Sequence, residues 1–227
     1  MKIIKLIIFA AALLVAALAQ GQATVGFTNT VNAVVPDANP TGLAVSQSLS
    51  AVPGTITNVT VTLDITGGFN GDLYAYLVDP NGNISILLNR VGVTAVGGNN
   101  YFGYGNTGFN VVLSEAGSSN IHNYQSGSYS VNGGGQLTGT WLPDGRNILP
   151  NSAPSVFDSA STSADLSVFN NMVPNGTWTL FIADLSAGGT STLVSWGLTV
   201  VTVPEPQTWA MVTGGLVTLL ALRRRSR

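Results

Sequence analysis

The clearest pattern of apolar and polar positions lies between residues 176 and 200. Residues 193–200 alternate with a period of two, which is typical of a strand that buries one face. Its apolar face is expected to carry Val194, Trp196, Leu198 and Val200. Residues 176–184 likewise place Trp178, Leu180 and Ile182 on one face, and a Ser/Gly/Thr-rich turn separates the two stretches. This pattern predicts two antiparallel strands that form one wall of a hydrophobic core.

The rest of the body repeats the strand pattern at short intervals. Residues 59–66 alternate between apolar side chains and Thr or Asp, and residues 72–88 predict a hairpin that turns at Asp79-Pro80-Asn81-Gly82. A further strand is expected over 108–116, and one or two edge strands within 24–53. Seven or eight strands without a helical period predict an all-β fold, a β-sandwich with jelly-roll-like connectivity.

Composition narrows the class of protein. A chain of 227 residues is long enough for one sizeable β domain. None of its residues is cysteine, which excludes disulfides and a thiolate metal site. Only 8% of the residues are charged and 27 are glycine, which fits an exported all-β surface protein better than a cytosolic enzyme.

The charge of the body is acidic. Between residues 20 and 203, two arginines stand against nine acidic residues, a net charge of −7. Nucleic-acid binding relies on clustered Lys and Arg side chains that neutralise phosphates. Nucleic acid is therefore not expected among the partners.

The first 19 residues have the layout of a secretory signal peptide. A short basic start precedes an apolar run and a small-residue ending, and these features predict a signal helix over residues 1–19. Cleavage is expected between Ala19 and Gln20, after delivery to the secretion translocon.

The last 25 residues, 203–227, predict a sorting tail. Pro204-Glu205-Pro206 ends the domain because proline cannot extend a strand or sit inside a helix. The apolar run 209–222 predicts a short transmembrane helix, below the roughly 20 residues that span a bilayer comfortably. An arginine cluster follows at Arg223, Arg224 and Arg225. The tail is expected to insert transiently in the inner membrane and then to be cleaved, with a lasting anchor as the alternative.

This combination of Pro-Glu-Pro, short apolar helix and terminal arginines resembles the PEP-CTERM sorting domain. The resemblance implies export by a Gram-negative bacterium that makes extracellular polysaccharide, as in biofilms. It also implies processing by an exosortase-type membrane transpeptidase. The expected destination is the cell surface or the extracellular matrix.

Residues 52–202 resemble the proprotein convertase P domain, also called homoB, with residues 20–51 as an N-terminal segment. The ordered motifs that carry the resemblance are Gly71-Asp72-Leu73, Leu77-Val78-Asp79-Pro80-Asn81-Gly82, Asp165-Leu166-Ser167-Val168-Phe169, Asn175-Gly176-Thr177-Trp178-Thr179-Leu180 and Leu193-Val194-Ser195-Trp196-Gly197-Leu198. In convertases this domain follows a subtilisin-like catalytic domain, which these residues do not contain. The resemblance therefore does not imply peptidase activity here.

Three kinds of chemistry remain as candidates. A Ser/His/Asp hydrolase would have to use His122, the single histidine, but a solvent-exposed loop histidine is the favoured interpretation. Calcium takes six to eight oxygen ligands, which makes Asp72, Glu115 and Asp184 candidate ligands. Asp79 and Asp144 are expected to stabilise turns instead.

Loop aromatics offer the third candidate. Exposed aromatic rings can stack on sugar rings, which makes four side chains candidate contacts for a secreted polysaccharide: Tyr101, Tyr104, Tyr124 and Trp141. The alternative is that they pack over the ends of the sandwich and stabilise the loops. The leading hypothesis is a non-catalytic exported structural or interaction module, with a carbohydrate-binding module second and a peptidase third.

Overall fold

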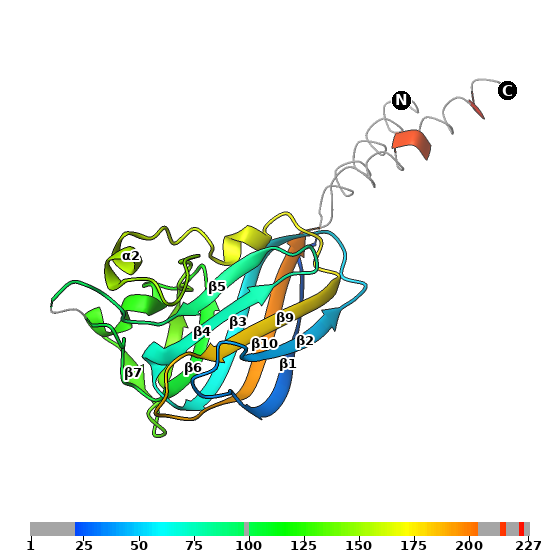
Figure 1. The fold of residues 1–227 in the computed structure, drawn as a ribbon. Coiled ribbons are helices and arrows are strands. Elements are labelled where there is room, and N and C mark those ends of the chain that lie inside the picture. The colour runs from blue at the N-terminus through cyan, green and yellow to red at the C-terminus, as the bar shows by residue number, and fades with distance from the viewer. Residues whose placement is uncertain (1–20, 98–99, 204–213, 217–222, 225–227) are drawn as a thin grey trace.

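The computed structural model describes residues 21–97, 100–203, 214–216 and 223–224. The strands lie within 23–203 and form two β-sheets packed face to face (Figure 1). The first sheet has six strands in the order β1 (Ala23–Val34), β10 (Ser191–Val203), β3 (Thr55–Gly67), β6 (Gly108–Ser114), β8 (Leu137–Trp141) and β7 (Ser130–Val131). The second has four, in the order β2 (Leu43–Leu49), β9 (Gly176–Asp184), β4 (Leu73–Val78) and β5 (Ile84–Asn89). The predicted all-β sandwich is confirmed.

Helices in the described body are short and lie in the connections. They are η1 (Asn70–Asp72), η2 (Ile121–Ser126), α2 (Pro154–Ser159) and η3 (Leu166–Phe169). The expected signal helix at 1–19 lies outside the described residues, as does most of the apolar run 209–222. Among the described residues, no helix has the length and apolarity needed to cross a membrane.

Strand pairing follows the jelly-roll scheme, in which the chain folds back as a double ribbon. The pairs are β1 with β10, β2 with β9, β3 with β6, and β4 with β5, all antiparallel. The first and last strands are therefore neighbours, and Ala23 pairs with Thr202. The additional strands β8 and β7 extend the first sheet beyond β6.

The core lies between the two sheets and uses the predicted alternation. Trp178 and Trp196 are fully buried, as are the apolar positions of β3. One position of β10 differs from the prediction: Leu193 is buried, whereas Val194 is only partly buried. The register against β3 shifts between Leu193 and Ser195, and this β-bulge moves the strand out of simple period-two alternation.

The predicted hairpin over 72–88 is also present, as β4 and β5. Asp79 closes its turn: the Asp79 carbonyl accepts a bond from the Gly82 amide at 3.1 Å. The Asp79 carboxylate accepts bonds from the backbone amides of Asn81 and Asn83 at 2.9 and 2.8 Å. The turn role expected of Asp79 is therefore confirmed.

Candidate functional site

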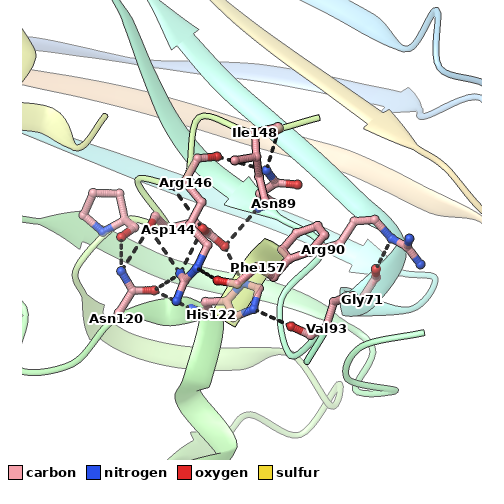
Figure 2. A network of polar contacts seen from close by, with 11 residues as sticks. Gly71, Asn89, Arg90, Val93, Asn120, His122, Asp144, Arg146, Ile148 and Phe157 are labelled. Carbon is pink, nitrogen blue, oxygen red and sulfur yellow. Dashed lines mark hydrogen bonds and ion pairs between the residues drawn. The ribbon is translucent and has the colours of Figure 1, made fainter. Parts of the chain in front are cut away.

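A buried polar network fastens the long loops to one side of the sandwich, with Asp144 at its centre (Figure 2). Asp144 is fully buried, and its carboxylate lies 2.7 Å from His122 Nδ1 and 3.1 Å from Arg146 Nη1. Oδ2 of the same carboxylate also accepts a 3.2 Å bond from the backbone amide of Asn89, the last residue of β5. The interpretation of Asp144 as a turn residue was therefore incomplete, because its side chain is an interior hub.

His122 belongs to this network, so the expectation of a solvent-exposed loop histidine was wrong. It is 2% exposed and lies 5.7 Å from Phe157, ring centre to ring centre, in a stacked arrangement. Its Nε2 lies 3.0 Å from the carbonyl oxygen of Val93. A carbonyl only accepts, so Nε2 carries the proton of that bond. Both ring nitrogens are thus engaged inside the protein, and Figure 2 shows them directed at Asp144 and Val93.

Arg146 and two asparagines extend the network into the connections. Arg146 Nε donates to the carbonyl of Phe157 at 3.0 Å, which ties helix α2 to the loop. Asn120 Nδ2 donates to the carbonyl of Pro143 at 2.7 Å, and Asn89 Nδ2 donates to the carbonyl of Arg146 at 3.0 Å. These bonds supply side-chain donors to the carbonyls of the loop backbone. The network accordingly stabilises the loops.

Arg90 makes a second, smaller junction. Its guanidinium donates to three carbonyl oxygens, those of Gly71, Tyr101 and Pro150, at 3.2, 3.0 and 3.4 Å. Burial lowers the pKa of Arg90, and nearby Asp72 opposes that change. The two arginines of the body are thus both used to hold loop backbone.

The candidate calcium ligands divide into a pair and an outlier. Asp72 lies in η1 and Asp184 ends β9, where the strand register places it opposite Leu73. Asp184 is fully buried, and Oδ2 accepts a 3.2 Å bond from the Ser191 hydroxyl. Burial raises the pKa of Asp184 to about 6 and also raises the pKa of Asp72. The two acids form a desolvated pair at one end of the sandwich.

Glu115 does not join them, so the expected triad of ligands was wrong. Asn70 in η1 accepts a bond from the amide of Gly108 at the start of β6, whereas Glu115 follows the far end of that strand. Seven residues of strand separate the two places by roughly 20 Å. Glu115 instead accepts a 2.9 Å bond from the amide of Leu166. Within the described part of the chain, no group of three or more His, Cys, Asp or Glu side chains could hold a metal ion.

The four predicted sugar contacts do not form an exposed platform. Tyr124 is 1% exposed and Trp141 is 7% exposed, and Tyr104 packs edge-on against Tyr124 with ring centres 4.7 Å apart. Burial raises the pKa of Tyr124 to about 12. Only Tyr101, 54% exposed, is available to a ligand. The other three are packed inside the protein: Tyr124 and Trp141 belong to the hydrophobic core and Tyr104 packs against it, where buried aromatic area stabilises the fold.

A different set of aromatic side chains lies on the outer face of the four-stranded sheet. β4 buries Leu73, Ala75 and Leu77, so Tyr74 and Tyr76 point outward. Tyr76 pairs across the strands with Phe181, and the two rings stack with centres 4.7 Å apart. Next to them on this face, hydroxyl pairs join β2 to β9: Ser46 with Thr179 at 2.9 Å and Ser48 with Thr177 at 3.1 Å.

These three aromatic residues were not among the predicted contacts, although the sequence held a signal for them. In 176–184 the buried face carries Trp178, Leu180 and Ile182, so Phe181 must lie on the opposite face. A large aromatic side chain at an outward position of a strand departs from the usual pattern of apolar inward and polar outward residues. Such a departure indicates a candidate binding surface. The same reasoning applies to Tyr74 and Tyr76.

The predicted processing signals fall mostly outside the described residues. This applies to the expected cleavage site at Ala19 and Gln20, to Pro204, Glu205 and Pro206, and to Arg225. Arg223 and Arg224 are described and are exposed in a short helical segment. These predictions therefore stay predictions.

Fold and site together define a jelly-roll β-sandwich whose interior polar groups hold its loops. No family model matches the chain, and no curated protein matches it either. It resembles a chain of the complex between the Aeromonas sobria serine protease and the chaperone ORF2, with 17% identity, a TM-score of 0.45, and coverage of 86% of this chain and 30% of that chain. The A. sobria serine protease solved without the chaperone is 15% identical, with a TM-score of 0.43. That match covers 80% of this chain and 27% of that chain. The chain spans less than a third of the length of those proteins, and likeness at this level carries no argument about activity.

Proposed function

We propose that this chain is a non-catalytic exported protein whose β-sandwich acts as a structural or interaction module at the cell surface or in the extracellular matrix. The observation that carries the proposal is the placement of His122. A hydrolytic triad needs histidine Nε2 directed at the nucleophile, whereas here Nε2 lies 3.0 Å from the Val93 carbonyl. The single histidine is explained as a cross-link between buried loops.

Delivery of the module is proposed from the two ends of the sequence. The signal peptide would direct residues 20–227 through the translocon, and the run 209–222 would hold the chain briefly in the inner membrane. An exosortase-type transpeptidase would then cut near Pro204-Glu205-Pro206. Because β10 ends at Val203, a cut there leaves every strand of the sandwich intact.

Intact mass and fractionation of the full chain test this proposal, in a host that carries such a transpeptidase. The expected product runs from Gln20 to near Val203 and is found outside the cell. A Glu205→Ala variant should stay in the membrane fraction, while Asn123→Ala, a control at an exposed position of η2, should be processed normally. If the wild-type product retained Arg223 to Arg227 and stayed in the membrane, the tail would be a lasting anchor and not a cleaved signal.

A peptidase assay tests the proposal that the protein is non-catalytic. The wild-type protein should not hydrolyse casein or a mixed peptide library. Hydrolysis that disappears in His122→Asn, with the melting temperature of that variant checked in parallel, would overturn the non-catalytic proposal.

A second candidate function is binding of a neutral secreted polysaccharide by the outer face of the four-stranded sheet. It is supported by Tyr74, Tyr76 and Phe181, whose rings adjoin rows of Ser and Thr hydroxyls. Among the described residues, the outward positions of β2, β9 and β4 carry no charged side chain, which suits an uncharged glycan. Aromatic rings and hydroxyl groups are complementary to the apolar faces and hydroxyls of sugars.

Affinity electrophoresis in gels that contain the host polysaccharide tests this second function. Wild-type protein should be retarded, and Tyr76→Ala should lose up to about tenfold in affinity, because one stacking aromatic contributes about 0.5–1.5 kcal/mol. Tyr101→Ala, which removes an exposed ring on a loop, is the matched control and should bind normally. If retardation were lost in Tyr101→Ala and kept in Tyr76→Ala, the glycan would bind at the loops and not on the sheet face.

A further inference from the structure

One side of the sandwich ends in two open strands. β1 is the edge of the six-stranded sheet and β2 is the edge of the four-stranded sheet, and residues 35–42 join them directly. Figure 1 shows both strands along the same side of the molecule. In the described part of the chain, the backbone of β1 is hydrogen-bonded along its length only to β10, and that of β2 only to β9. Each therefore presents a row of unpaired backbone groups.

The opposite side is covered. The free edge of β5 bonds to the loop backbone, with Asp144 and Gly145 amides donating to Leu87 and Ile86 carbonyls at 3.1 and 2.9 Å. The Ile86 amide donates to the Ala164 carbonyl at 2.8 Å. In the six-stranded sheet the far edge is β7, which is only two residues long. Covering and shortening are two ways in which proteins block edge pairing, and both are used on this side.

The side formed by β1 and β2 has neither a covered edge nor a short edge strand. β1 has twelve residues and β2 has seven, and neither strand contains a charged residue or proline. The one irregularity in β1 is a register shift between Thr30 and Ala33, where Asn32 has a φ of 49°. Residues 23–30 thus form an uninterrupted, uncharged edge. Charges, prolines and bulges are what usually keep such an edge from pairing.

The open side also leaves core side chains half covered. Eight partly buried apolar residues pack against the core, and five of them belong to β1 and β2: Val25, Phe27, Val31, Leu43 and Val45. They pack against the core from this side, and Phe27 lies edge-on to the buried Trp196 with ring centres 4.9 Å apart. Continuing each sheet past its edge would bury these side chains further.

From these observations we propose that the β1 edge, residues 23–30, is a docking site for a second copy of this chain, joined by antiparallel pairing of β1 with β1. Two identical strands can always pair this way about a two-fold axis, and such an interface is self-complementary. None of the nine acidic residues of the body lies in β1, so the paired strands would not repel each other. The alternation of β1 fixes which face must stay inward, and this limits the register.

The proposal goes beyond the module function above and does not rest on it. It would join the six-stranded sheets of two copies into one continuous sheet. The outer face of the four-stranded sheet, which carries Tyr76 and Phe181, would remain free in each copy. Loss of self-association and loss of glycan binding are therefore separable results.

Because the chain contains no cysteine, single cysteines can report the pairing directly. Thr24→Cys, Thr28→Cys and Thr30→Cys place a thiol at exposed outward positions along β1, and Thr62→Cys is the control on the central strand β3 of the same sheet. Under mild oxidation of the full chain in a mild detergent, at least one β1 variant should form a disulfide-linked dimer. Thr62→Cys should remain monomeric.

Charge variants give the second measurement, by sedimentation velocity. Thr28→Lys should raise the dimer dissociation constant by about tenfold or more, because it adds a positive charge to each of the two paired edge strands, and charged side chains on an edge strand oppose pairing. Thr62→Lys should leave it unchanged, and equal melting temperatures would show that both variants fold. A wild-type monomer at every concentration, with no β1 cysteine cross-linking more than Thr62→Cys, overturns the proposal.

Discussion

Replacing Asp184 with asparagine should make the protein more stable at neutral pH and flatten its dependence on pH. Asp184 is fully buried at the end of β9, and neighbouring Asp72 adds to the cost of ionising it. Its carboxylate has weak compensation, namely a 3.2 Å bond from Ser191 and a 3.4 Å bond from the amide of Ser186. Asparagine keeps the shape and the capacity for both hydrogen bonds but carries no charge.

Because the pKa of Asp184 is raised in the folded protein, its contribution to stability decreases as the pH rises. Below pH 3.8 Asp184 is protonated in both the folded and the unfolded chain, so its contribution to stability is fully present. As the pH rises toward 6, the unfolded chain ionises while the folded protein keeps the proton, and stability is lost. A change in pKa from 3.8 to about 6 corresponds to about 3 kcal/mol at neutral pH, as an upper value.

Urea unfolding followed by tryptophan fluorescence measures this effect, at several pH values from about 4 to about 7.5. Trp178 and Trp196 are both buried in the core and report global unfolding. Asp184→Asn should gain up to about 3 kcal/mol at the upper end of the range and little at the lower end. Asp37→Asn, an exposed carboxylate on the nearby loop, is the matched control and should shift the curve only slightly.

One outcome would refute this reasoning. If Asp184→Asn lost more than about 1 kcal/mol at neutral pH and kept the wild-type pH dependence, the folded protein would have to favour the charged form of Asp184, and the pKa of Asp184 would not be raised. Its charge would then be stabilised by partners stronger than the two bonds described.

Two further predictions concern the buried network and metal binding. His122→Ala removes one of the two side chains that contact the buried Asp144 carboxylate and should cost about 3 kcal/mol of unfolding free energy, whereas Asn123→Ala on the exposed neighbour should cost less than about 0.5 kcal/mol. Equal costs would mean that the network does not stabilise the loops. Millimolar calcium should change the melting temperature by less than about 1 °C relative to chelator, because Glu115 lies far from Asp72 and Asp184. A rise of more than about 5 °C would mean that two carboxylates and backbone oxygens suffice to bind the ion.

Much of the sandwich could be predicted from the sequence, because its strands alternate with a period of two and its hairpin has a standard turn. The register shift near Val194 could not, since a bulge depends on how β10 pairs with β3 and not on local pattern. Strands β7 and β8 were hidden in a glycine-rich stretch, and β8 is held by parallel pairing with β6, far from it in sequence. Long-range pairing outweighs weak local propensity at such positions.

The candidate site was predicted less well, for a related reason. The sequence predicts His122, Tyr124 and Trp141 in polar, exposed loops, but the structure places them in η2 and at the end of β8, where their side chains are buried. Asp72 and Asp184 do come together, because β4 and β9 are neighbours, whereas Glu115 belongs to the other end of β6. Acidic residues cluster only if they lie at the same end of neighbouring strands. The order of strands in the sheet, which the local sequence pattern does not give, determines this.

The pairing of Ala23 with Thr202 has a mechanical consequence. Both ends of the sandwich leave from adjacent backbone positions, so a chain held by its tail alone transmits no tension through the sheets. Pulling on the two ends against each other would separate β1 from β10 one hydrogen bond at a time, like a zipper. The fold is therefore suited to a tether at one end, and would open under low force if it were stretched between two attachments.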